Sequence, residues 1–299
     1  MVILYLMIPP EPDVPEGQRG VGSAPVRYED VSEDGRIRLT SLSHFLGLAL
    51  WQNAVANNGP SRTAARQGIV PVLTRLAFEG GSGPHSVRRP VEGRGCFQLA
   101  HTVDDAGGPD RILLNMWLTM TAPAGRTYGP PPPNRGEPIV AGRVFGEHVF
   151  TRLFAPKAER KVLALPGLEG PPPARYTWRA AEDLVALPPA ATPLDDDLIA
   201  DDAPIVFGLT HSDSNHHVNS LVYPILFEDA ALRRFHALGL TTRVLAHSLE
   251  IAYRKPCFAG EAYRIHLRAF REDGALAAAG TFVPAGGGRP HCHIVMRFS

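Results

Sequence analysis

The ten residues THSDSNHHVN, at positions 210–219, contain three histidines, one aspartate and two asparagines. A carboxylate beside an imidazole in a partly dry site can act as a general base, and amide groups can donate hydrogen bonds to an oxygen that becomes negative. Histidines gathered in one loop can also bind a metal ion. The same residue types are common in turns and helix caps, so a purely structural loop is the third interpretation.

The segment after this loop predicts a helix. Residues 219–239, NSLVYPILFEDAALRRFHALG, repeat apolar side chains at helical spacing, with Asn219 or Ser220 as the N-cap and Gly239 as the C-cap. Pro224 would lie in the first turn, where a helix tolerates proline best. The free N–H groups at a helix start carry partial positive charge, so the loop would lie where a developing oxyanion is stabilised.

Two other kinds of chemistry involve the same histidines. A metal ion could be bound by His211, His216 and His217, whose imidazoles are suitable ligands. The sequence holds no second ligand cluster, so we expect no metal. We interpret His211 and His216 as loop residues at the rim of a pocket. Cys257 could be a thiol nucleophile with His217 as its base, although a lone cysteine beside a proline is more often a small buried apolar residue. The two histidines of HCH, residues 291–293, would share one face of a strand.

The bulk composition argues against several classes of protein. The chain has 299 residues, with 30 Lys and Arg against 30 Asp and Glu, and a net charge of zero gives no electrostatic case for binding nucleic acid or an anionic membrane. Three distant cysteines do not make a disulfide framework, which indicates a reducing cytoplasm. No stretch approaches the length of a membrane span, and the apolar start, residues 1–12, predicts a first strand or a disordered end.

A stretch rich in proline, alanine and acidic residues, 187–204, predicts a linker between residues 1–186 and residues 205–299. Each part has the pattern of a helix followed by an antiparallel meander, and the helix of the first part is expected over 41–59. We therefore predict an α+β fold with two antiparallel sheets, each wrapped around the helix of its own part. The strand-like runs lie at 68–80, 93–105, 110–123, 142–156, 243–257, 261–273, 275–285 and 289–299.

The loop and helix together resemble a family signature. From Asp213, the sequence DSNHHVNSLVYPILFEDAALR is similar to the DxNxHVNNxxYxxxxxEA signature of hotdog-fold acyl-ACP and acyl-CoA thioesterases. The resemblance implies a double hotdog, in which repeat 1–186 is non-catalytic and shapes the pocket while repeat 205–299 carries the catalytic motif. It also implies acyl-CoA or acyl carrier protein as substrate partner, no cofactor, and a monomer or homodimer that needs neither nucleic acid nor membrane.

The resemblance assigns roles residue by residue. Asp213 would act on the thioester directly or through water, while Asn215 and His217 would position or activate the attacking group. The backbone N–H groups of Val218 and Asn219, at the helix start, would face the thioester carbonyl. The substrate-binding residues implied in this way are Val218, Asn219, Ser220 and Tyr223.

One position departs from the family pattern. Where plant-type enzymes carry a further glutamate on the strand after the helix, this chain has Pro256. Two alternatives to hydrolysis therefore stay open. One is a hotdog dehydratase or hydratase of 3-hydroxyacyl or enoyl thioesters, whose DxNPxH pattern differs because Asp213 and His217 lie one residue closer and no proline follows Asn215. The other is a degenerate hotdog protein that binds acyl chains without catalysis.

Overall fold

The structure of the chain is a computed structural model that describes residues 7–299. It divides into two compact units, one ending at Trp178 and the other running from Arg179 to Ser299. The strands belong to one broad, mostly antiparallel sheet of 13 strands, which corrects the prediction of two separate sheets. The predicted strand or disordered end at residues 1–12 lies partly outside the described residues.

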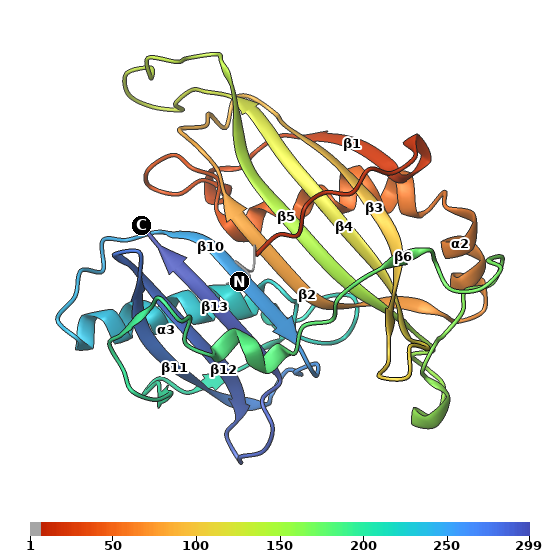
Figure 1. Cartoon of the computed structure of the whole chain (residues 1–299). Helices are drawn as coiled ribbons and strands as arrows, with labels where there is room; N and C mark the ends of the chain where they lie inside the picture. The colour runs from red at the N-terminus through yellow and green to blue at the C-terminus, as the bar shows by residue number, and fades with distance from the viewer. Residues whose placement is uncertain (1–6) are drawn as a thin grey trace. The chain divides into compact units, whose positions relative to one another are not determined.

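The first unit is built on long antiparallel strands in the order β1-β3-β4-β5-β2, with the short β6 parallel to β3 (Figure 1). The near-continuous apolar run ILLNMWL in β4 accompanies burial of that strand on both faces. The strands are β1 (Arg19–Ala24), β2 (Val70–Gly80), β3 (Val91–Val103), β4 (Pro109–Pro123), β5 (Pro138–Thr151) and β6 (Ala174–Arg175).

The helical segment of this unit lies where the sequence predicts one helix over 41–59, but it is broken. It consists of α1 (Leu39–Leu42), the π-helix η3 (Leu46–Val55) and α2 (Gly59–Arg66), with the short 3₁₀ turns η1 (Glu16–Gln18), η2 (Tyr28–Asp30) and η4 (Lys157–Glu159) elsewhere. The π-helix packs on β1, β3 and β4. The Asn58 side chain accepts the N–H of Ser61 at 3.1 Å, so the NNG sequence starts α2 as well as ending η3.

The second unit contains a meander in the order β10-β13-β12-β11, in which every neighbouring pair is antiparallel. The four strand-like runs that the sequence predicts here are confirmed. They are β10 (Ala246–Tyr253), β11 (Ala262–Glu272), β12 (Ala275–Pro284) and β13 (Cys292–Phe298).

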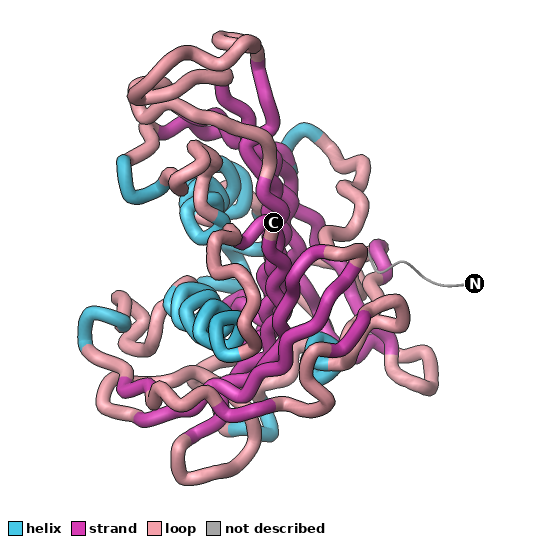
Figure 2. Tube along the Cα trace, turned by 90° about the vertical axis from the view of Figure 1, so that its left-hand side faces the viewer, coloured by secondary structure: helices cyan, strands magenta, loops and turns pink. Residues whose placement is uncertain are grey.

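Helix α3 (Val222–Ala237) packs against β10, β11 and β13 of its own unit, and Figures 1 and 2 show it along one side of these strands. Its first residue is Val222 and its N-cap is Leu221, so the predicted N-caps Asn219 and Ser220 lie one or two residues too early. It ends as predicted: Gly239 has a φ of 69°, and the N–H of Leu240 donates to the carbonyl of Phe235 at 2.9 Å. The buried residues of the helix are Tyr223, Pro224, Phe227, Ala230, Ala231 and Phe235.

The segment before α3 includes the expected linker, residues 187–204, and it is tied to the second unit. It supplies three short strands at the edge of β11 and two carboxylates that pair with α3. Asp195 accepts from Nε of Arg234 at 3.0 Å and from the N–H of Ala269 at 2.8 Å, and Asp201 accepts from Nε of Arg233 at 3.1 Å. The short elements are η5 (Ala181–Val185), β7 (Thr192–Pro193), β8 (Ile199–Ala200), β9 (Ile205–Val206) and η6 (Leu209–His211).

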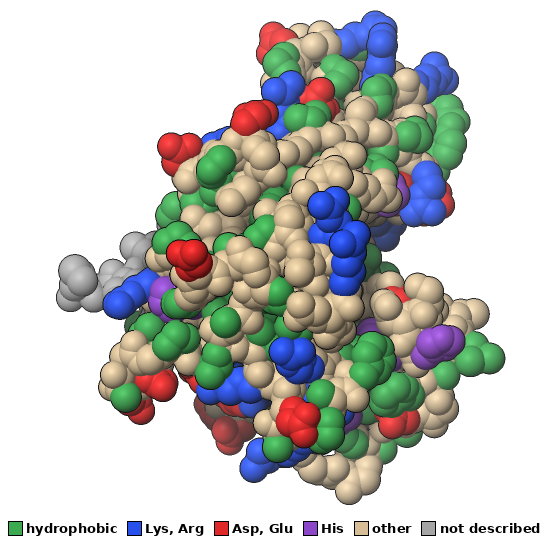
Figure 3. All heavy atoms as spheres, turned by 90° about the vertical axis from the view of Figure 1, so that its right-hand side faces the viewer, with side chains coloured by type: hydrophobic (Ala, Val, Ile, Leu, Met, Phe, Trp, Pro, Cys, Tyr) green, Lys and Arg blue, Asp and Glu red, His purple; other side chains and the backbone are tan. Residues whose placement is uncertain are grey.

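The charged side chains are mixed in sign on the face that Figure 3 draws, where acidic and basic groups lie among apolar and uncharged ones. This distribution accompanies the equal numbers of acidic and basic residues in the chain, 30 of each. Among the described residues, no helix has the length and apolar character that crossing a membrane requires.

We expect Arg234→Ala to lower the free energy of unfolding by about 3 kcal/mol, because it leaves the carboxylate of Asp195 buried without its cation. Asp195 is only 5% exposed. Far-ultraviolet circular dichroism in urea should measure the change, since all three tryptophans lie in the first unit. Arg243→Ala, at an exposed loop position, is the control and should stay within about 0.5 kcal/mol of wild type. Equal stability of the two variants would contradict the assignment.

The ion pair of Asp195 with Arg234 should make the free energy of unfolding depend on pH. Burial alone raises the pKa of the Asp195 carboxyl, but the hydrogen bonds of Arg234 and of the Ala269 N–H outweigh it, and the pKa lies below its ordinary 3.8. A lowered folded-state pKa contributes stability above the unfolded-state pKa and loses it as the pH falls. We therefore expect the stability advantage of wild type over Asp195→Asn to shrink as the pH is lowered through about 4. A constant difference from pH 7 to pH 3 would argue against it.

Candidate active site

The motif residues form a compact loop in front of α3. Ser212 and Val218 make an isolated antiparallel bridge, and between them the N–H of Asp213 donates to the carbonyl of His217 at 3.2 Å. The N–H of His216 donates back to the carbonyl of Asp213 at 3.0 Å, and His216 has a φ of 61°, in the left-handed region. His216 is thus a turn residue, as the sequence analysis expects.

Two donors hold the carboxylate of Asp213. Its Oδ1 accepts from the N–H of Asn215 at 2.8 Å, and its Oδ2 accepts from Nδ2 of Asn219 at 3.0 Å. The side chain is half-buried, so one part of it faces solvent. Asn219 uses its remaining amide oxygen to accept the N–H of Leu221 at 2.8 Å, which ties the carboxylate to the approach of α3.

The imidazole of His217 has a defined orientation. Its Nδ1 lies 3.1 Å from the carbonyl oxygen of Val218. A carbonyl can only accept, so Nδ1 carries the hydrogen and Nε2 of the neutral ring keeps its lone pair. His217 is half-buried, and Nε2 is the proton acceptor that the loop offers.

The predicted catalytic residues are only partly brought together. Asp213 and His217 lie in the same turn, but in the part of the chain that the structure describes no hydrogen bond or ion pair joins the carboxylate of Asp213 to the ring of His217. The side chain of Asn215 is exposed, and its backbone N–H is what contacts Asp213. The carboxylate and the imidazole are therefore two separately held groups rather than a hydrogen-bonded dyad.

The N–H groups expected to face a thioester carbonyl are occupied. The N–H of Val218 donates to the carbonyl of Cys257 at 2.8 Å, and the N–H of Asn219 donates to the carbonyl of His211 at 2.8 Å. This corrects the role given to these two N–H groups. The physical reason is that α3 starts only at Val222, so both N–H groups pair with the carbonyls of Cys257 and His211 instead of standing free at a helix start.

The other two residues of the implied substrate-binding set, Ser220 and Tyr223, also make contacts within the protein. The carbonyl of Ser220 accepts from Oη of Tyr253 at 2.8 Å. Tyr223 is buried, its ring packs against Phe207 and Phe282, and burial followed by a hydrogen bond with Cys257 raises its pKa.

A second group of polar side chains lies behind the loop, and the sequence analysis did not connect it to the motif. The Nδ1 atom of His291 lies 3.0 Å from Oη of Tyr263, 3.1 Å from the carbonyl of Pro256 and 3.6 Å from Sγ of Cys257. Tyr263 in turn donates to Oε2 of Glu261 at 2.8 Å. The sequence HCH at 291–293 indicated that His291 and His293 would share one face of a strand. It did not indicate that His291 would contact Tyr263 and Pro256.

Cys257 therefore contacts His291, not His217 as the thiol-nucleophile alternative requires. It is fully buried, and burial raises the pKa of its thiol. Burial lowers the pKa of His291, and the charge of Lys255 lowers it further. A protonated thiol next to a neutral imidazole is a structural pair rather than a thiolate nucleophile.

Histidines of the motif do not assemble a metal site. His211 uses Nδ1 to accept the N–H of Gly208 at 3.1 Å, and its ring lies edge-on to Phe207. Among residues 7–299, no three His, Cys, Asp or Glu side chains lie together in a metal-binding arrangement.

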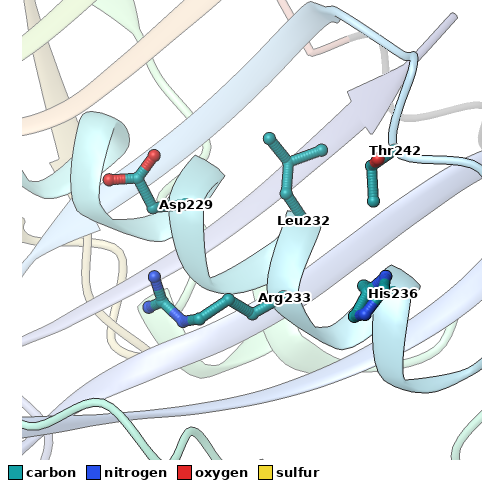
Figure 4. A pocket seen from close by; sticks show the side chains of 5 residues that line it. All are labelled: Asp229, Leu232, Arg233, His236 and Thr242. Carbon is teal, nitrogen blue, oxygen red and sulfur yellow. The ribbon is translucent and has the colours of Figure 1, made fainter.

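A surface pocket of the second unit lies on the outer side of α3, away from the motif in sequence. Figure 4 shows its lining: four side chains from α3 and one from the loop after it. The lining residues are Asp229, Leu232, Arg233, His236 and Thr242. None of them is a residue of the loop, so this pocket does not enter the chemistry of the candidate site.

No protein-family model matches the chain, and no curated protein matches its sequence. Solved structures resemble it over almost its whole length. An acyl-ACP thioesterase from Bacteroides thetaiotaomicron has a TM-score of 0.57 at 15% identity, covering 95% of this chain and 99% of that one. A 12:0-ACP thioesterase from Umbellularia californica has a TM-score of 0.56 at 12% identity, covering 94% of each chain. The chain therefore has the hotdog fold found in acyl-ACP thioesterases.

We expect His216→Gly to keep or raise the free energy of unfolding, because glycine adopts a φ of 61° without steric cost. His216→Val should lower it by about 1–2 kcal/mol, because a branched side chain clashes in the left-handed region. Urea unfolding followed by circular dichroism measures both variants, and Ser214→Val, at an exposed position of the same loop, is the control. A free energy of unfolding lower for His216→Gly than for His216→Val would contradict this account of position 216.

Proposed function

We propose that this chain is a thioesterase that hydrolyses an acyl thioester of coenzyme A or of an acyl carrier protein. The supporting observation is the loop of residues 213–219, in which a held carboxylate and an imidazole with a free Nε2 lie before the helix of a hotdog fold. Two structures with the same fold, from B. thetaiotaomicron and U. californica, are described as acyl-ACP thioesterases, which favours this substrate class.

In the proposed step, the carboxylate of Asp213 orients a water molecule and Nε2 of His217 takes one of its protons. The water oxygen bonds to the carbonyl carbon of the thioester, and the carbon–sulfur bond then breaks. The proton reaches the leaving thiolate through Nε2 of His217, so the products are a carboxylic acid and a thiol. The donors on both oxygens of Asp213 fix the orientation of the carboxylate for this task.

The oxyanion needs donors other than the N–H groups of Val218 and Asn219, which are occupied. The side-chain amide of Asn215 is exposed and makes no hydrogen bond within residues 7–299, and asparagine amides are known to serve this purpose. We assign it to the carbonyl oxygen of the bound thioester. This site would offer one hydrogen-bond donor to the oxyanion, where an oxyanion hole with two donors would offer one more. We therefore expect a low kcat.

We further propose that the chain is a double hotdog, with residues 1–186 as a pocket-shaping repeat and residues 205–299 as the catalytic repeat. The order of elements supports this division, because each unit combines a helical segment with antiparallel strands that it packs against. The chemistry-bearing loop lies wholly in the second unit.

A second candidate function is binding of an acyl thioester without hydrolysis. The observation that favours it is the loss of both backbone donors together with the proline at position 256, where the plant-type pattern has glutamate. Binding without thiol release would identify this case.

The test is thiol release from a panel of acyl-CoA and acyl carrier protein thioesters, followed with a chromogenic thiol reagent. We expect wild type to release thiol and Asp213→Asn to lower kcat/KM by at least about 100-fold, because a neutral amide replaces the carboxylate that orients the attacking water. Asp229→Asn, at an exposed position on α3, is the matched control and should retain activity. Unchanged turnover in Asp213→Asn would remove Asp213 from the chemistry.

A further inference from the structure

We propose that His291 is a positioning residue for His217, acting through the turn at Pro256–Cys257 and the peptide of Val218. This inference rests on the proposed thioesterase function and adds a residue to the same site. It is argued from a series of hydrogen bonds, linked through the backbone of Pro256–Cys257 and of Val218, that runs from Glu261 to the ring of His217.

The first step is the tautomer of His291. Tyr263 has one hydroxyl hydrogen and gives it to the carboxylate of Glu261 at 2.8 Å. The Tyr263 oxygen, 3.0 Å from Nδ1 of His291, therefore accepts, and the carbonyl of Pro256 at 3.1 Å can only accept. Nδ1 of His291 must carry a hydrogen, which it shares between these two oxygens.

The second step is the turn that His291 holds. Its side chain donates to the carbonyl of Pro256, and its own carbonyl accepts the N–H groups of Arg254 at 2.8 Å and Lys255 at 3.1 Å. Sγ of Cys257 packs against the same ring nitrogen at 3.6 Å. One residue thus fixes four consecutive positions, from Arg254 to Cys257, by its main chain and its side chain.

The third step joins this turn to the motif. The carbonyl of Cys257 accepts the N–H of Val218 at 2.8 Å, and the carbonyl of Val218 accepts Nδ1 of His217 at 3.1 Å. The peptides on both sides of Val218 are therefore held. A shift of the turn moves the acceptor that keeps the hydrogen of His217 on Nδ1 and leaves Nε2 free as the base.

The groups around His291 support a positioning role rather than a charge switch. Tyr263 and Glu261 come from β11 and the turn before it, and Lys255 and Cys257 come from the turn after β10. Protonation of His291 at Nε2 would leave its Nδ1–H and both acceptors in place. The bonds that hold the turn thus depend on the identity of the side chain, not on its charge.

The test compares His291→Asn with His291→Leu. The Nδ2 amide of asparagine can replace the Nδ1–H donor, whereas leucine removes it. With an acyl-CoA that wild type hydrolyses, we expect leucine to lower kcat by about 10- to 100-fold with KM nearly unchanged, and asparagine to restore kcat to within about 3-fold of wild type. His266→Leu on β11 is the control, because its side chain makes no hydrogen bond within residues 7–299, and it should keep wild-type kcat.

A second readout separates this inference from the proposed activity. Long-range proton–nitrogen correlation spectra of protein labelled with ¹⁵N-histidine report the tautomer of His217 without any substrate. We expect the Nδ1–H form in wild type and His291→Asn, and loss of that form in His291→Leu. An unchanged His217 tautomer in His291→Leu, or equal loss in both variants, would overturn the positioning role. Absence of thiol release by wild type, with the tautomer change intact, would overturn only the thioesterase function.

Discussion

The hydrogen bond from the N–H of Val218 to the carbonyl of Cys257, 2.8 Å long, is the constraint on which the candidate site depends. It pairs the motif loop with the turn after β10 and sets where α3 starts, because residues that pair as extended backbone cannot also begin a helix. It leaves the carbonyl of Val218 as the acceptor for His217. The orientation of the imidazole, the start of α3 and the loss of the Val218 donor follow from this contact, while the carbonyl of His211 occupies the N–H of Asn219.

The consequence for chemistry is a site built from side chains. Asp213 is held through the N–H of Asn215 and the amide of Asn219, and His217 through a neighbouring carbonyl. Backbone donors are rigid and pre-aligned, whereas an exposed side-chain amide must be ordered when substrate binds, which costs conformational entropy. The proposed hydrolysis is therefore consistent with a fold that retains the acid and the base but has moved its oxyanion donor.

Much of this arrangement could be predicted from the sequence because it is local. The period of apolar residues gives α3, the apolar runs give the long strands β2 to β5 and β10 to β13, and the spacing of Asp213, Asn215 and His217 gives the loop. The rest depends on partners distant in the chain. The pairing of Val218 with Cys257 and the contacts of His291 have no signature in either segment alone. The proline-rich stretch 187–204 has linker composition, yet edge pairing with β11 and the Asp–Arg pairs on α3 hold it to its unit.

The most direct measurement is a crystal structure of the wild-type protein with a non-hydrolysable thioether analogue of an acyl-CoA that it cleaves. The structural argument predicts the analogue carbonyl within hydrogen-bonding reach of the side-chain amide of Asn215, with the sulfur on the side of Nε2 of His217 and the carboxylate of Asp213 facing the carbonyl carbon. An analogue seated in the pocket formed by Asp229 and His236 on α3, with the loop of residues 213–219 empty, would contradict the assignment of the active site.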